Sequence, residues 1–174
     1  MTSFVGVLTI SDSAARGDAP DRSGPLLVEL VQSLWPEETP LTAVIPDDRK
    51  VIAERLRAWA DEWSLALIVT TGGTGFARRD VTPEATADVI DRGAPGLAEA
   101  IRAAGRQVTP HAMLSRGVAG MRGETLIVNF SGSPKAVAEQ FAVVAPVLPH
   151  ALELLRPTDE GIRHALPGEH ARRT

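Results

Sequence analysis

The 174-residue sequence contains no cysteine, which excludes disulfide bonds, thiolate metal sites and a cysteine nucleophile. It also lacks an apolar run long enough to cross a bilayer, and its first residues carry no basic segment or cleavage signature of a secretory leader. Its histidines lack the spacing of metal ligands, so no zinc site is expected. These absences favour a cytoplasmic protein that does not bind membranes.

An excess of positive charge is absent too. The net charge of -4 argues against broad binding to nucleic acid or to a membrane surface, although a local arginine can still hold a phosphate. The expected partner is therefore a small molecule. With 44% hydrophobic residues, the chain is long enough for one compact domain. We expect residues 1–156 to form it and residues 157–174, which show no apolar periodicity, to be a flexible tail.

Apolar runs alternate with helical stripes along the chain. The runs predict strands at 4–10, 41–45 and 65–70, and a hairpin from 115–121 and 125–130. Between them we expect a helix after Pro25, one capped by Asp47 or Asp48, helices at 83–92 and 95–104 that stop at glycines, and a last helix from Pro134. This order predicts a three-layer α/β domain, a mostly parallel sheet with helices on both faces and a small hairpin.

Two tryptophans continue an aliphatic helical stripe. Trp59 and Trp63 follow Ile52 and Leu56 at helical spacing, so we expect all four to face inward. A role in the core or in a contact between subunits is favoured over a stacking platform for a ligand.

A glycine-rich loop follows the strand at 65–70. Gly72, Gly73 and Gly75 allow positive φ and a close approach of an anion to the backbone, and Thr74 adds a hydroxyl. The spacing matches neither the Walker motif nor the dinucleotide fingerprint, and a turn that only reverses the chain is an equal alternative for the glycines alone. The Arg78-Arg79-Asp80 that follows favours phosphate binding. Thr82 is the expected cap of the next helix, with Pro83 at its first position.

The polar loops of such a sheet meet at the carboxyl ends of its strands, where ligands bind. Four loops are expected there: 11–13, 46–48, 71–80 and 131–134. Neighbouring strands lie about 4.8 Å apart, so carboxylates from two adjacent strand ends could share one Mg²⁺. Asp47 and Asp80 are the candidate pair. Asp47 could instead cap a helix, and Asp12 could form an Asx turn with its own loop.

Several sequence blocks together resemble a known family, the molybdopterin adenylyltransferases of MogA/MoaB type, from about Phe4 to Leu155. The blocks are Ile10-Ser11-Asp12, Ile45-Pro46-Asp47, Thr71-Gly72-Gly73-Thr74-Gly75 with Arg78 to Thr86, Ala94-Pro95-Gly96, Met113-Leu114-Ser115-Arg116 and Gly132-Ser133-Pro134-Lys135. Two positions depart from the pattern of many relatives, since Ser131 stands where they have proline and Gly105 where some have serine.

The resemblance implies adenylylation of molybdopterin by Mg-ATP, with release of pyrophosphate. Asp47 and Asp80 would be the catalytic and metal-binding residues, and Gly72, Gly73, Thr74, Gly75 and Arg79 would surround the phosphates. Ser115 and Arg116 would bind the pterin or its phosphate. The loop of Ser131, Gly132, Ser133 and Pro134 would line the nucleotide side, and Ser11 and Asp12 would complete the rim.

The resemblance also implies a homotrimer and hand-over of the product to a MoeA-like molybdate-inserting protein. The alternative within the family is a protein that binds or carries molybdopterin without catalysis, since binding and catalysis share most of the rim.

Overall fold

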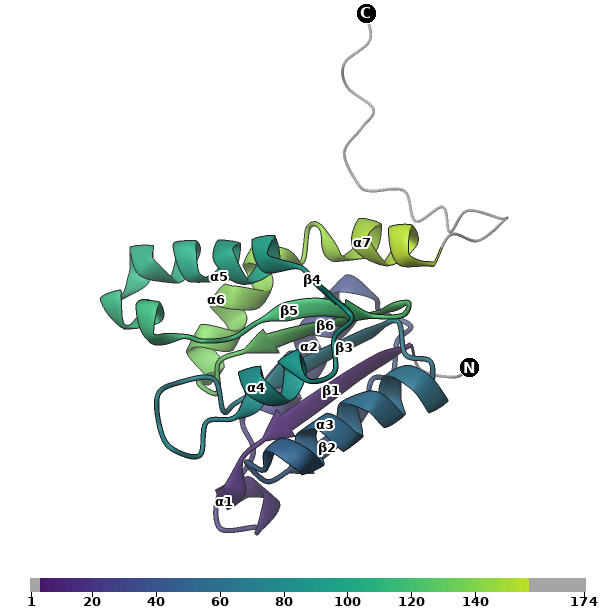
Figure 1. Ribbon diagram of the computed structural model, residues 1–174. Helices are drawn as coiled ribbons and strands as arrows, with labels where there is room; N and C mark the ends of the chain where they lie inside the picture. Colours follow the sequence, from purple (N-terminus) through teal and green to yellow (C-terminus); the bar gives the residue numbers. More distant parts are fainter. Residues whose placement is uncertain (1–3, 157–174) are drawn as a thin grey trace, which may run out of the picture.

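The computed structural model describes residues 4–156, so the predicted tail at 157–174 lies outside the described residues (Figure 1). One mixed sheet of six strands runs through the domain in the order β2-β1-β3-β6-β5-β4. The parallel strands are β1 (Val5–Ile10), β2 (Leu41–Ile45), β3 (Leu67–Thr71) and β6 (Thr125–Phe130). The last two, β5 (Ala119–Arg122) and β4 (Arg92–Gly93), are antiparallel.

The sheet has helices on both faces, which confirms the predicted fold class (Figure 1). One face packs on α2 (Ser23–Leu34), α5 (Pro95–Val108), α6 (Pro134–Val144) and α7 (Leu148–Leu155). The other packs on α3 (Arg49–Arg57) and α4 (Thr82–Ala87). Short elements complete the chain: α1 (Asp12–Ala15), a π-helical turn η1 (Ala58–Glu62) and a 3-10 helix η2 (Pro110–Leu114).

The predicted apolar runs form the inner strands. Every residue of β1, β3 and β6 is buried, because both faces of these strands are covered. Along β1 the side chains alternate between the two cores, so Val7 joins the layer of α2 and α6 while Leu8 joins the layer of α3. β2 lies at the sheet edge and shows alternating exposure instead.

Several predicted boundaries were wrong. The helix predicted to reach residue 92 ends at Ala87, and Gly93 belongs to β4, where its backbone pairs with Gly120. Gly105 lies inside α5, which continues to Val108. The first strand of the hairpin begins at Ala119, not at residue 115, because the preceding residues form η2 and an extended segment. The hairpin itself is confirmed, with Gly123 at a positive φ of 53° in its turn.

The two tryptophans have different surroundings. Trp59 is buried in the core beneath β1 and β3, as expected, whereas Trp63 is 56% exposed. The expectation that Trp63 faces inward was wrong, because the helix ends in the π-helical turn η1 and Trp63 is its C-terminal cap residue.

The last described residue, Arg156, forms hydrogen bonds at the end of the sheet where the strands begin. Arg156 donates from Nη2 to the carbonyl of Ser64 at 2.6 Å, just before β3, and from Nε to the carbonyl of Glu124 at 3.4 Å, just before β6. Phe4 lies at the same end, where its N–H donates to Glu38.

No helix among residues 4–156 is both long and apolar enough to cross a membrane.

Gly6 provides a test of this packing. A Cβ at Gly6 would lie 2.6 Å from the Trp59 ring and 2.8 Å from Leu65, both buried. We expect Gly6→Ala to lower the free energy of unfolding by about 1–3 kcal/mol through overpacking. Gly96→Ala is the matched control, because a Cβ there meets nothing within 4 Å. Urea denaturation of both variants measures the effect, and equal stabilities would contradict it.

Candidate functional site

A pocket of about 410 Å³ opens at the carboxyl ends of the parallel strands. The chain leaves β1 toward β2 on one side and then crosses to β3 on the other, so strand order reverses between β1 and β3. Such a reversal leaves a crevice in which open α/β sheets bind ligands. All four predicted rim loops contribute to the pocket, through Ser11, Ser13, Asp47, Gly72, Gly73, Asp80, Gly132 and Pro134.

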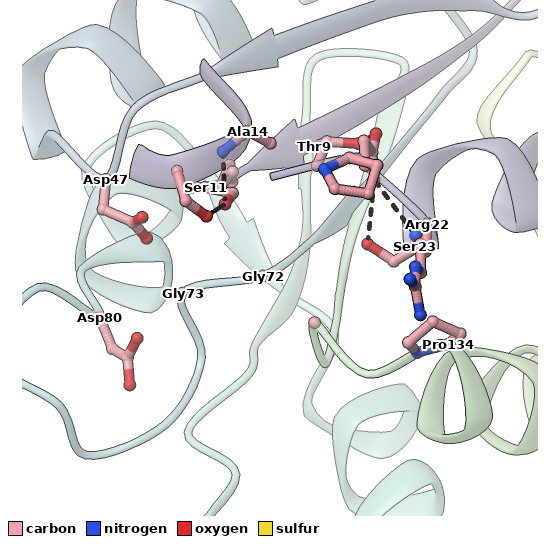
Figure 2. Close-up of a pocket in the computed structure, with 15 residues that line it drawn as sticks. Thr9, Ser11, Ala14, Arg22, Ser23, Asp47, Gly72, Gly73, Asp80 and Pro134 are labelled. Carbon is pink, nitrogen blue, oxygen red and sulfur yellow. Dashed lines mark hydrogen bonds between the residues drawn. The ribbon is translucent and has the colours of Figure 1, made fainter. Parts of the chain in front are cut away.

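The pocket has two chemically different sides. Figure 2 shows the carboxylates of Asp47 and Asp80 on one side, and Thr9, Arg22, Ser23 and Pro134 on the other. Gly72 and Gly73 run between them. An anionic group with a cation would fit the acidic side, while the other side offers hydroxyls and a guanidinium.

The two glycines between these sides have left-handed backbones, with φ of 101° at Gly72 and 63° at Gly73. A Cβ at Gly72 would collide with the Ile10 carbonyl, and one at Gly73 would collide with the Thr82 hydroxyl and crowd Asp47. The predicted positive φ is therefore confirmed at Gly72 and Gly73 but not at Gly75, and both confirmed positions require glycine for space as well as conformation. The Thr82 hydroxyl donates to the Gly72 carbonyl at 2.9 Å, so Thr82 secures this turn and the prediction that it caps α4 was wrong.

Asp12 and Asp47 exchange hydrogen bonds. The Asp12 N–H donates to Asp47 Oδ2 at 2.8 Å, and the Asp47 N–H donates to Asp12 Oδ1 at 3.1 Å. Asp47 does not cap the helix, because Asp48 caps α3 through the N–H groups of Lys50 and Val51. The Asp12 carboxylate accepts from Asp47 and Arg79, which lie outside its own loop. The exchange ties the end of β1 to the end of β2 and aims Asp47 into the pocket.

The charges around this pair act on its protonation. Burial raises the pKa of the Asp47 carboxyl above its ordinary value, and the charges of Asp12 and Asp80 raise it further. Arg79 donates to both oxygens of Asp12 at 2.9 Å and holds the pKa of Asp12 below its ordinary value. Asp47 is thus a half-buried carboxylate beside two others, and a cation at this point would offset their repulsion.

Asp80 reaches the pocket by a different path from the one predicted. β1 lies between β2 and β3, so Asp47 and Asp80 do not follow adjacent strands, and that part of the expectation was wrong. The loop after β3 carries Asp80 back toward Asp47 instead. Asp80 Oδ2 accepts the N–H of Ala77 at 2.9 Å, which orients the carboxylate within its own loop.

The other predicted site residues do not line the pocket: Asp12, Thr74, Gly75, Arg79, Ser115, Arg116, Ser131 and Ser133. Ser131 is held by Gln140, which accepts from its N–H and donates to its hydroxyl, both at 2.8 Å. Two protein hydrogen bonds therefore order the loop in which serine replaces proline. Ser133 occupies the cap position of α6 without a side-chain capping bond.

Sequence reasoning missed the wall formed at the start of α2 by the three residues before the helix and by its first residue: Pro20, Asp21, Arg22 and Ser23. Asp21 is its anchor. It accepts from the Thr9 hydroxyl at 2.6 Å and from the N–H groups of Ser23 and Gly24 at 3.1 and 2.9 Å. The position of Asp21 before Ser23-Gly24-Pro25 is a capping signal. It could have placed the predicted start of the helix at Ser23 instead of after Pro25. Its contact with Thr9 depends on the fold and has no local signal.

The donor set fits Mg²⁺ better than metals that need several protein ligands. Residues 4–156 contain no cluster of three or more His, Cys, Asp or Glu side chains arranged around one point as metal ligands. Mg²⁺ is usually bound through one or two carboxylates together with substrate phosphates and water. Asp47 and Asp80 can supply those carboxylates, and the glycine turn leaves room for the phosphates.

Comparison with known proteins agrees with this geometry. The family described as "Probable molybdopterin binding domain" matches residues 6–150. The chain belongs to this family. The family's domain therefore includes the whole pocket, from β1 to the first turn of α6.

Relatives in this molybdopterin-binding family include short and long proteins. The chain is 39% identical to the molybdopterin adenylyltransferase of Helicobacter pylori strain 26695, over 88% of each chain. It is 43% identical to the molybdenum cofactor synthesis protein cinnamon of Drosophila melanogaster, covering 86% of this chain but only 25% of that protein. The chain thus spans about a quarter of that longer relative.

Solved structures agree with the fold. The molybdopterin biosynthesis enzyme MoaB from Thermus thermophilus superposes with a TM-score of 0.80 at 46% sequence identity, covering 88% of this chain and 96% of that one. The family membership and the α/β fold predicted from the sequence are both confirmed.

The raised pKa of Asp47 generates a prediction about stability. The folded protein holds the Asp47 proton more tightly than the unfolded chain, so wild-type stability falls as the pH rises from about the ordinary value of 3.8 through the raised pKa. Asp47→Asn removes this loss and keeps an acceptor for the Asp12 N–H. We expect the stability of Asp47→Asn relative to wild type to increase through that window and then level off.

Urea denaturation from about pH 4 to about pH 7 measures this difference. Asp48→Ala is the contrasting variant, because it removes the helix cap and should cost about 1 kcal/mol. A relative stability of Asp47→Asn that stays flat or falls with pH would contradict the electrostatic origin.

Proposed function

We propose that this chain transfers the adenylyl group of ATP to molybdopterin, giving adenylated molybdopterin and pyrophosphate. The observation that carries the proposal is the meeting of Asp47, Asp80 and the Gly72–Gly73 turn in one pocket at the strand reversal. The 39% identity to a named molybdopterin adenylyltransferase, over 88% of both chains, supports the same reaction.

In this reaction a phosphate oxygen of molybdopterin forms a bond to the α-phosphorus of ATP. The bond from that phosphorus to the oxygen bridging the β-phosphate breaks, and pyrophosphate leaves with the electron pair. The nucleophile belongs to the substrate, so the protein contributes positioning and charge stabilisation. This agrees with a pocket lined by carboxylates, hydroxyls and glycines.

Asp47 and Asp80 would hold Mg²⁺, which when bound neutralises charge on the transferring phosphate. Asp12 keeps Asp47 in place through their paired hydrogen bonds, and Arg79 keeps Asp12 charged. Gly72 and Gly73 let phosphate approach the backbone. Gly132 and Pro134 lie on the nucleotide side, while Ser115 stays a candidate contact for the pterin.

One incubation tests the reaction. Purified protein, molybdopterin, ATP and Mg²⁺ should release pyrophosphate in proportion to the adenylated molybdopterin formed, and omission of Mg²⁺ should stop both. Binding of molybdopterin without pyrophosphate release would instead support a carrier protein of the same family.

The first variant to test is Asp80→Asn. It removes a charge at nearly constant volume, and we expect the rate of adenylyl transfer to fall at least about tenfold, which is about 1.4 kcal/mol of barrier. Asp47→Asn should behave similarly. Asp48→Asn is the matched control, since Asp48 is exposed, does not line the pocket and caps α3, a role that asparagine also fills. A normal rate for Asp80→Asn would remove Asp80 from the mechanism.

We also propose that the protein is a homotrimer in the cytoplasm that hands its product to a MoeA-like molybdate-inserting protein. The exposed apolar side chains that support assembly are Trp63, Val108, Met113 and Leu114. A contact between subunits would bury such surface.

Light scattering tests the trimer. The expected mass is about three times the 18.5 kDa of the chain, as a closed cyclic assembly requires, and a mass near 18.5 kDa would contradict it. Trp63→Glu tests whether Trp63 lies in the contact. Trp59→Glu would not test the contact, because Trp59 is buried in its own protomer.

A further inference from the structure

Arg116 binds both ends of the loop that carries Asp80. Its N–H donates to the Thr74 carbonyl at 2.9 Å, and Nε donates to the Gly75 carbonyl at 2.7 Å. Nη2 donates to the carbonyl of Asp80 itself at 2.6 Å, and Nη1 pairs with Glu84 on the first turn of α4. One side chain thus fixes the loop before and after its outermost part.

The residues between these two contacts lie at the surface. Residues 76–79 are all exposed, and the Phe76 side chain packs into neither core cluster. The Asp80 carboxylate is oriented by the N–H of Ala77, which belongs to the same exposed segment. Apart from the pair of Arg79 with Asp12, the position of this carboxylate over the pocket therefore depends on the fixed ends of the loop more than on packing.

We infer that Arg116 is a positioning residue that fixes the backbone at Asp80, and that Glu84 holds the Arg116 guanidinium in place. The inference rests on the proposed adenylyl transfer, and it replaces the expectation that Arg116 binds the pterin. All three guanidinium nitrogens donate to protein oxygens, and two of these oxygens belong to the loop of Asp80. A carbonyl acceptor on each side of the loop suits the planar fork of arginine.

The environment of Glu84 decides which variant to make. Its Oε2 is buried and, among the described residues, has no hydrogen-bond partner. Deleting the Arg116 charge would leave this carboxylate without its counter-charge and destabilise the domain. Arg116→Lys keeps a positive charge near Glu84, but an ammonium on a flexible stem does not reproduce the fork that spans Gly75 and Asp80.

The first measurement needs no enzymatic activity. Trypsin cleaves after Arg78 and Arg79, which lie in the exposed segment, and mass spectrometry identifies the products. We expect Arg116→Lys to speed this cleavage at least about threefold, because cleavage follows the population of the opened loop. Arg49→Lys is the matched control, since Arg49 forms a two-bond pair with Asp88, at 2.6 and 2.7 Å, and neither residue belongs to the loop of residues 74–80.

The second measurement is kinetic. A loosened Asp80 should lower kcat at least about tenfold while KM for molybdopterin changes less than about threefold, because the loss falls on the transition state. In the Asp80→Asn background the added effect of Arg116→Lys should shrink to less than about twofold, as expected for residues that act as a unit. Arg49→Lys should leave kcat unchanged.

The outcomes separate this inference from the proposed function. Absence of pyrophosphate release by the wild-type protein would reject the function, while the cleavage rates would still test the loop. A wild-type enzyme for which Arg116→Lys raises KM for molybdopterin at unchanged kcat and unchanged cleavage would overturn the inference and assign Arg116 to the pterin. If Arg116→Lys does not fold, Glu84→Gln gives the same test, and unchanged cleavage and kcat there would also overturn it.

Discussion

The whole pocket depends on how closely three strand ends approach one another. Gly72, at the end of β3, lies so near the Ile10 carbonyl at the end of β1 that a Cβ would not fit. On its other side the Gly72 N–H donates to the Phe130 carbonyl at the end of β6. Backbone atoms therefore pack directly on backbone atoms where these three strands end. The candidate site residues lie on the loops that follow these strand ends.

A second constraint is electrostatic. Three aspartates, Asp12, Asp47 and Asp80, gather at one side of the pocket, and only Asp12 has an arginine on its carboxylate. The charges of Asp12 and Asp80 disfavour ionisation of Asp47, so this arrangement opposes folding when all three carboxylates are charged. The hydrogen bonds that hold Asp12 and Asp47 together resist this repulsion without removing it.

The sequence predicts the parts of the fold whose signal is local. The buried strands β1, β3 and β6 are continuous apolar runs, and the glycine turn is apparent from its composition. β4 has no such signal, because Arg92 and Gly93 are exposed and are a strand only through pairing with β5. For the site, the meeting of Asp47 and Asp80 in one pocket is predictable, but the contact of Asp21 with Thr9 and the bonds of Arg116 to the Asp80 loop are not. Those contacts join residues 12 and 36 positions apart in sequence, and residue type alone does not encode them.

Both ends of the described domain lie at the edge of the sheet where the strands begin, opposite the pocket. Phe4 enters β1 there, and Arg156 docks beside the starts of β3 and β6 (Figure 1). Polypeptide joined at either described end would therefore start at the side of the sheet opposite the pocket. This geometry suits a domain that is built into a longer chain, and the match covers only 25% of the Drosophila melanogaster relative.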